Sequence, residues 1–202
     1  MFVRACVTAG LLGLCSLTAQ ADTYRVDLIV FQNLYAASAG GLPTSTPAAD
    51  AIALTDTARL SAAGIRILSD SDFALQDQWV RLRSSSQFRP LVRLAWTQVD
   101  PPAERGPSLQ LRQGTPFTVY DPQGLSSFLS TPIDGSVALH LSRYLHLDVD
   151  AMLNEQRGTG AMAYRLNDRR RMRRDELHHL DSPKLGVLAK VTRIDATAAA
   201  SN

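Results

Sequence analysis

Cysteine is almost absent from this 202-residue sequence, and its two copies, Cys6 and Cys15, both lie near the start. The same region combines a basic residue, an apolar stretch over 7–17 and the small residues of Ala-Gln-Ala at 19–21. This combination predicts a secretory signal peptide over residues 1–21. The mature chain would then contain no cysteine, which excludes disulfides, a thiol nucleophile and cysteine ligands for a metal.

Long hydrophobic runs and lysine are also scarce. The apolar stretch of the signal is shorter than the ~20 residues of a bilayer-spanning helix, and no second candidate follows, so we expect a soluble mature chain without a transmembrane segment. Lysine occurs only as Lys184 and Lys190, and the formal net charge is +2. A charge so near zero, in an exported protein, argues against nucleic-acid binding. The local basicity is arginine, which suits bidentate contacts to carboxylate or phosphate.

Recognisable catalytic motifs are missing as well. The sequence has no Gly-x-Ser-x-Gly, no phosphate loop and no dinucleotide fingerprint. His140 and His146 would stand about 20 Å apart on one extended strand, and the adjacent His178 and His179 would point to opposite faces. We therefore expect no metal and no other cofactor. An exported metal-dependent hydrolase that uses His178 or His179 with Asp181 is retained as an alternative.

What the sequence does have is an arginine-rich closing stretch over 164–194, YRLNDRRRMRRDELHHLDSPKLGVLAKVTRI. Alternation in its first part places mostly apolar residues on one face and a row of arginines on the other. The row consists of Arg165, Arg169, Arg171 and Arg173. Charged residues at 174–176 interrupt the alternation as a turn would, and alternation resumes over 185–191, so the stretch predicts a hairpin.

This arginine row needs a partner or exposure to solvent. Neighbouring guanidinium groups repel one another and weaken a sheet unless an anion lies against them. That anion is either a carboxylate of the protein itself or part of a ligand. The alternative is a solvated basic face, which is the usual role of a charge run.

Strand-like alternation recurs over 24–31, 88–99 and 137–150. Trp79, with apolar neighbours at helical spacing, predicts a main helix over 73–84. A strand, a helix and a strand in this order can form a right-handed crossover that joins two parallel strands. The 137–150 segment predicts one long, half-exposed strand.

We therefore expect residues 22–195 to form a single α+β domain. Its sheet would be mixed, mostly antiparallel and of about five to seven strands, with one main helix packed on it. Residues 34–57, rich in Ala, Ser, Gly and Pro, predict a mobile surface loop, and residues 196–202 predict a disordered tail.

Four aromatic or imidazole side chains are considered as ligand contacts. Trp79 and Trp96 lie on the apolar sides of their elements, which favours core packing. Tyr144 and His146 lie on the polar face of the 137–150 strand. They are therefore candidates for contact with a sugar or a peptide.

The chain also resembles a known family. The resemblance rests on YRVDLIVFQN at the mature start, LVRLAWTQV, GSVALHLSRYLHLDVD and the closing arginine-rich stretch. Together these are similar to the CsiV (cell shape integrity) family of periplasmic proteins. The family's closing motif has Tyr, Phe, His and Phe where this chain has His179, Leu180, Ser182 and Leu185.

The resemblance implies a non-enzymatic periplasmic protein that binds peptidoglycan and supports cell-wall synthesis and cell shape. It also implies a partner, the outer-membrane lipoprotein that activates a bifunctional penicillin-binding protein. The residues themselves supply the candidate contacts: the arginine row for carboxylates of the stem peptides, with Tyr144 or His146 beside it. A pure protein-protein interaction module is a further alternative.

Overall fold

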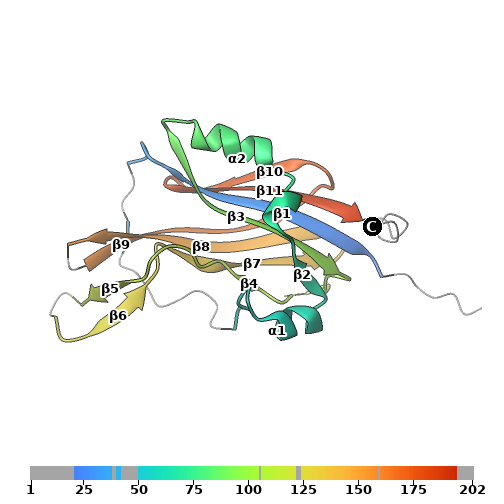
Figure 1. The fold of residues 1–202 in the computed structure, drawn as a ribbon, viewed down its shortest axis with the longest axis horizontal. Helices are drawn as coiled ribbons and strands as arrows, with labels where there is room; N and C mark the ends of the chain where they lie inside the picture. The colour runs from blue at the N-terminus through green and yellow to red at the C-terminus, as the bar shows by residue number, and fades with distance from the viewer. Residues whose placement is uncertain are drawn as a thin grey trace, which may run out of the picture.

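The computed structural model describes residues 21–37, 40–41, 50–104, 106–121, 124–158 and 160–194. In these residues the fold is mostly β, with two large antiparallel sheets stacked face to face (Figure 1). The first sheet has the order β10-β11-β1-β3-β2, the second has the order β4-β7-β8-β9, and β5-β6 form a separate hairpin. The expectation of one sheet covered by a main helix is therefore wrong. The predicted signal peptide and tail fall almost wholly outside the described residues, as do parts of the predicted mobile loop.

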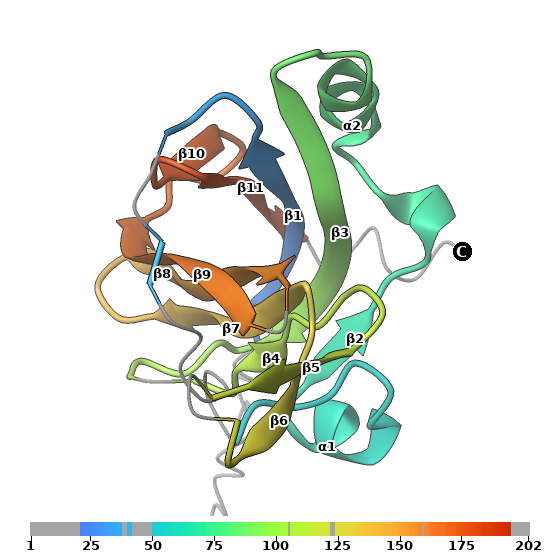
Figure 2. The same cartoon turned by 90° about the vertical axis from the view of Figure 1, so that its left-hand side faces the viewer.

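The first sheet is built from five strands of very different length. Its strands are β1 (Thr23–Asn33), β2 (Ile65–Ile67), β3 (Phe88–Val99), β10 (Leu177–Asp181) and β11 (Leu185–Ile194). The short helix α1 (Thr57–Ala62) precedes β2, and η1 (Asp70–Asp72) precedes α2 (Gln76–Arg83). Seen from the end, α2 stands against β3 on the side away from the second sheet (Figure 2).

The second sheet carries the longest strands of the molecule. It contains β4 (Leu109–Gln110), β7 (Ile133–Leu141), β8 (Leu145–Arg157) and β9 (Gly160–Arg171). The hairpin of β5 (Phe117–Tyr120) and β6 (Ser127–Ser130) extends from one end of it (Figure 1). In the described part of the chain, every helix is too short and too polar to span a bilayer.

The main core lies between the two sheets. Val26, Leu28 and Val30 of β1 and Trp96 of β3 face Leu139 and other apolar side chains of the second sheet, and all are 0% exposed. The opposite face of β1 is buried too, because Ile29 packs with Phe73 and Leu75 beneath α2. Burial on both faces explains why the β1 sequence is an almost continuous apolar run rather than a clean alternation.

The proposed crossover between 24–31 and 88–99 is wrong, because β1 and β3 are antiparallel neighbours. Asn33 at the end of β1 pairs with Phe88 at the start of β3. The N–H of Leu34 donates to the carbonyl of Gln87 over 2.8 Å. The long connection thus returns to the end of the sheet that it left, which requires antiparallel strands.

The predicted single strand over 137–150 is in fact the hairpin of β7 and β8. Residues 142–144 form the turn, in which the N–H of Ser142 donates to the carbonyl of Tyr144. Leu141 and Leu145 pair across it, and both point inward. Because they are four positions apart, an even number, the inward-outward alternation continues through the turn without a change of phase. The alternation in the sequence therefore gives no indication of the turn.

The predicted closing hairpin is also wrong. β9 pairs with β8, whereas β11 pairs with β10 and β1, so the two segments belong to different sheets. Residues 174–176 do form a turn, with Asp175 at a φ of 65°. That turn carries the chain from one sheet to the other. Met172 before it and Leu180 after it are both buried in the core between the sheets, which anchors the turn on either side.

Candidate functional site

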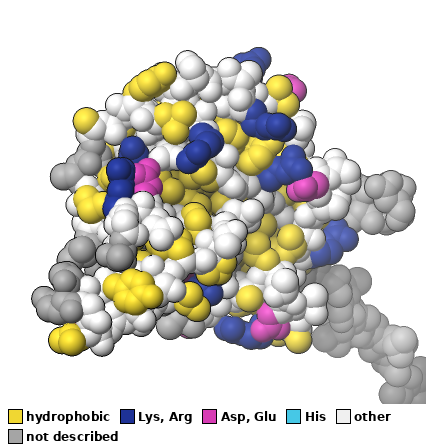
Figure 3. Space-filling model, turned by 60° about the vertical axis from the view of Figure 1, so that its left-hand side comes forward, with side chains coloured by type: hydrophobic (Ala, Val, Ile, Leu, Met, Phe, Trp, Pro, Cys, Tyr) yellow, Lys and Arg dark blue, Asp and Glu magenta, His cyan; other side chains and the backbone are white. Residues whose placement is uncertain are grey.

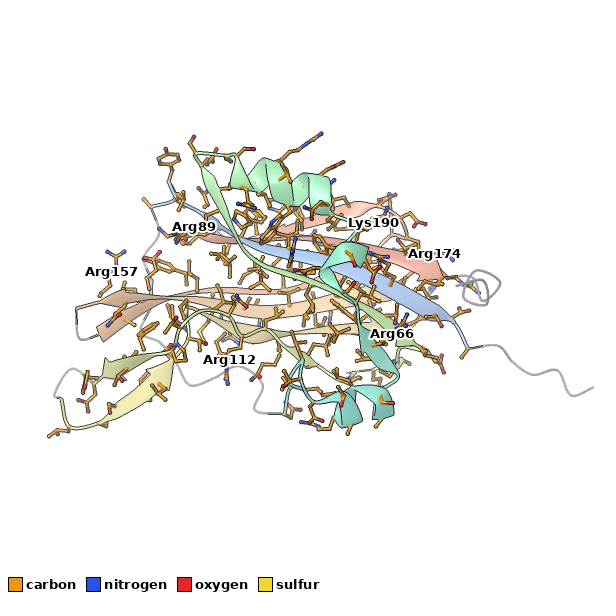
Figure 4. All side chains as sticks on the ribbon, in the orientation of Figure 1. Arg66, Arg89, Arg112, Arg157, Arg174 and Lys190 are labelled. Carbon is orange, nitrogen blue, oxygen red and sulfur yellow. The ribbon has the colours of Figure 1, made fainter. Side chains whose placement is uncertain are left out.

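The predicted arginine row lies on β9 and the residues just after it. β9 spans the length of the molecule: Arg157 and Arg174, which flank it in the chain, lie at opposite ends in Figure 4. Tyr164 and Leu166 are buried, whereas Arg165, Arg169 and Arg171 are exposed, so the predicted two-faced character of this strand is confirmed. The exposed face looks away from the first sheet.

Two members of the row are held by carboxylates of the neighbouring strand. Arg169 donates from Nε and Nη2 to the two carboxylate oxygens of Asp148, at 2.7 and 2.8 Å. Arg165 makes the same forked contact with Asp150, at 2.7 and 2.5 Å. These hydrogen bonds raise the pKa of both guanidinium groups. The protein itself therefore supplies the anion for this half of the row.

The other two members have weaker partners. Arg171 lies opposite His146 in the strand register, where no carboxylate is offered. Its guanidinium carbon lies 3.4 Å from the ring centroid of Tyr144, so two of the predicted site residues meet in a cation–π contact. Arg173 approaches Glu176, at 3.7 Å between Nη1 and Oε1. No ion pair holds Arg171 within the described residues.

A concave region, here called the basic hollow, lies over this second half of the row. It has a volume of about 470 Å³ and is lined by Arg169, Arg170, Arg171, Arg173, Glu176 and His178. Arg170 is paired with Asp168 over 3.1 Å. Arg169 is paired with Asp148, and Arg173 approaches Glu176. Among the described residues, Arg171 therefore supplies the positive charge of the hollow that has no ion pair, and this charge favours an anionic ligand.

A second concave region, here called the acidic groove, adjoins the first and shares Arg169 with it. Its volume is about 670 Å³. The side chains that give it its character are Asp50, Ser108, Ser136, Asp148, Asp150, Asn167, Asp168 and Arg169. Asp50, Asp148 and Asp150 were assigned no role from the sequence. The signal that could have identified Asp148 and Asp150 is their i, i+2 spacing on the strand that pairs with the arginine row.

His140 and His146 are stacked face to face, with ring centroids 5.2 Å apart. The expected separation of about 20 Å is wrong, because the hairpin turn places the two residues opposite each other. His140 is 4% exposed, its Nδ1 has no hydrogen-bond partner, and that atom lies 3.8 Å from Oδ2 of Asp148. Burial lowers the pKa of the His140 imidazole, against the opposing effect of Asp148. His146 is fixed by Nδ1 against the Tyr144 carbonyl, 2.9 Å away.

The second histidine pair is divided between two environments. Nε2 of His178 accepts the backbone N–H of Arg173 over 3.0 Å. His179 stacks on Phe31 with ring centroids 5.7 Å apart. Across the described residues no group of three or more His, Cys, Asp or Glu side chains is arranged to hold a metal ion.

The surface also has exposed hydrophobic side chains at the β5-β6 hairpin. Leu125 and Leu129 are 87% and 73% exposed, and Tyr120 and Phe128 are also exposed. On the face that Figure 3 shows, basic side chains lie in small groups, several beside an acidic one, with hydrophobic side chains between them.

Fold and surface together define a β-rich domain whose long edge strand presents a basic hollow beside an acidic groove. A family model described as "Peptidoglycan-binding protein, CsiV" matches residues 5–194, and the chain belongs to this family. This confirms the resemblance seen in the sequence. Membership implies a periplasmic or cell-wall location. No curated protein and no solved structure shows a significant match to the chain.

Proposed function

We propose that this protein is a non-enzymatic accessory factor of the periplasm that binds peptidoglycan through the basic hollow. The observation that carries the proposal is the state of Arg171, which faces solvent, rests on Tyr144 and has no ion pair within the described residues. Stem peptides of peptidoglycan carry carboxylates, and a guanidinium group binds a carboxylate through two parallel hydrogen bonds. Family membership supplies the ligand class, and the hollow supplies the chemistry for it.

Within the predicted site, we assign different roles to its six residues. Arg171 and Arg173 contact the ligand, and Tyr144 holds the Arg171 side chain in place through the cation–π contact. Arg165 and Arg169 are bound to Asp150 and Asp148 and keep the β8-β9 surface in shape. His146 supports the turn at Tyr144 through the contact of its Nδ1 with the Tyr144 carbonyl.

Co-sedimentation with purified sacculi tests this proposal. The mature chain is mixed with sacculi at low and moderate salt, and sacculus integrity is followed in the same tubes. We expect binding that weakens with salt, because exposed charge pairs are screened, and no digestion. Charge reversal of both Arg171 and Arg173 to Glu is expected to abolish sedimentation. Unchanged sedimentation of a folded double variant would refute the assignment, and digestion would favour the hydrolase.

A matched control exists on the other sheet. Arg66 is exposed on β2, across the molecule from β9 (Figures 2 and 4). Arg66→Glu changes the net charge by the same amount per residue as Arg171→Glu. If binding were a nonspecific effect of net charge, the two variants would lose it equally.

The partner implied by the resemblance, an outer-membrane lipoprotein that activates a penicillin-binding protein, needs a surface of a different kind. The exposed apolar side chains of Leu125 and Leu129 on the β5-β6 hairpin favour this second role, because such residues drive protein association when they are buried. Replacement of both by Ser is expected to abolish co-purification of the lipoprotein and to leave sacculus binding intact. Retained co-purification would exclude the hairpin.

A further inference from the structure

The acidic groove and the basic hollow are neighbours of opposite charge. This arrangement limits the class of ligand that can bind to both. Both are lined by Arg169, so they meet near the C-terminal end of β9. Asp148 and Asp150 of the groove lie opposite Arg169 and Asn167 in the strand register. Arg171 and Arg173 follow two and four residues later in the chain. The centres of the two charged regions, near residues 168 and 172, are therefore roughly 13 Å apart at about 3.3 Å per residue.

Each region keeps polar groups that are free for a ligand. In the described part of the chain, the Asp50 carboxylate forms no ion pair and the Asn167 side chain forms no hydrogen bond, although both line the groove. Asp148 and Asp150 have arginine partners, but a carboxylate has about four lone-pair sites and can accept further donors. In the hollow, Arg171 has only the Tyr144 ring.

These groups match a ligand that carries an ammonium and a carboxylate joined by a chain long enough to reach from the groove to the hollow. An ammonium offers three donors and no acceptor, which suits the carboxylate and amide oxygens of the groove. A carboxylate suits the guanidinium groups of the hollow. A ligand with only a carboxylate would leave the groove unused, and a neutral sugar would use neither charge.

We propose that this paired surface binds the zwitterionic end of an uncrosslinked stem peptide, with the free ammonium in the acidic groove and a carboxylate in the basic hollow. This inference rests on the proposed function, since it names the part of peptidoglycan that is recognised. A cross-link converts that amine into an uncharged amide. The protein therefore prefers wall material whose stem peptides are not yet cross-linked.

The test uses soluble disaccharide-peptide fragments in three forms: with the amine and carboxylates free, with the amine acetylated, and with the carboxylates amidated. Affinities for the full mature chain are measured by isothermal titration calorimetry. Each modification is expected to weaken binding about tenfold, since each removes a charge-assisted contact. Asp50→Asn should remove the sensitivity to acetylation and keep the sensitivity to amidation. Arg171→Gln should do the reverse.

Matched controls are Asp77→Asn on α2 and Arg66→Gln on β2, which are exposed residues away from both regions. Equal affinity for all three fragments, or no affinity for any, would overturn this inference; if sacculi are still bound, the proposed function survives. Loss of sacculus binding by the wild-type chain would overturn the proposed function itself. Acetylation sensitivity that persists in Asp50→Asn would overturn the assignment of the ammonium to the groove.

Discussion

Arg165 and Arg169 form one half of the arginine row, and Arg171 and Arg173 form the other. In sequence the two halves are alike, since all four are arginines at outward positions. In the structure, β8 presents Asp150 and Asp148 to the first half, whereas His146 of β8 and the Tyr144 ring of the preceding turn face Arg171 in the second. The first half is thus neutralised by the protein, and the second half is available to a ligand.

This difference shows that strand register, rather than the number of arginines, decides where a basic surface can bind. Register is set by the short turn between β8 and β9, where Arg157 pairs with Gly160 and Gly158 has a φ of 59°. The spacing of the arginines in the sequence and their local net charge would both suggest that all four bind a ligand equally well. The carboxylate partners of Arg165 and Arg169 give these two arginines a structural role, and Arg171 and Arg173 are left to bind a ligand.

The largest effect is expected when a carboxylate is installed opposite Arg171. His146→Asp would give Arg171 the partner that Asp148 gives Arg169, at the equivalent register position. Binding to sacculi should then fall about tenfold without the loss of any arginine, because the ligand must compete with an internal carboxylate. Sedimentation titrations measure this. His146→Asn is the matched uncharged control, and a loss of similar size in that variant would contradict the reasoning.

A smaller effect is expected when the ring beneath Arg171 is removed. Tyr144→Leu keeps an apolar side chain but removes the cation–π contact, which contributes about 0.5–1 kcal/mol at exposed sites. Sacculus affinity, measured in the same titrations, should therefore drop roughly threefold. Tyr144→Phe retains the ring and should bind as the wild type does. Equal weakening in both variants would indicate that the hydroxyl, not the ring, matters.

The stability of the protein should also depend on pH through His140, which lies beside Asp148, the partner of Arg169. Burial depresses the pKa of His140 in the folded state, so the unfolded chain takes up its proton first as pH falls below about 6.5. Unfolded chains then bind more protons than folded ones, and stability decreases as the pH falls through about 6.5. Urea midpoints measure this. His140→Asn should flatten that part of the pH dependence.

The smallest effect is expected for Arg165→Gln. Its pairing with Asp150 is exposed, and such pairs contribute about 0.2–1 kcal/mol. The free energy of unfolding should decrease within that range, and sacculus affinity should stay within about twofold of the wild type. Loss of affinity comparable to that of Arg171→Gln would remove the distinction between the two halves.

Sequence patterns predicted a good part of this fold. The segments of β1 and β3 were identified as strands, and the inward residues at the start of β8 were identified by alternation, because alternate burial requires alternate apolar side chains. The outward face of β9 was identified in the same way. The family resemblance, carried mainly by the β7-β8 and β9-β10 segments, was confirmed by the family model.

The remaining features depend on pairing over long distances. The turn at 142–144 left the alternation in phase, so a hairpin had the pattern of one strand. Residues 164–194 were joined into one hairpin because neither segment indicates which strand it pairs with. The contact between Arg171 and Tyr144 joins the end of β9 to the β7-β8 turn, so it could not be predicted while this turn was unrecognised. Asp50 comes from a distant connection whose position only the folded chain determines.

The most direct test of the central claim compares Arg171→Gln with Arg165→Gln in sacculus binding at low salt, with unfolding curves measured on the same preparations. The two substitutions remove the same group from the same face of one strand. We expect Arg171→Gln to lose about tenfold in affinity and Arg165→Gln to keep its affinity, while the unfolding curves show both variants to be folded with similarly small losses of stability. Equal loss of affinity in both variants would contradict the division of the row.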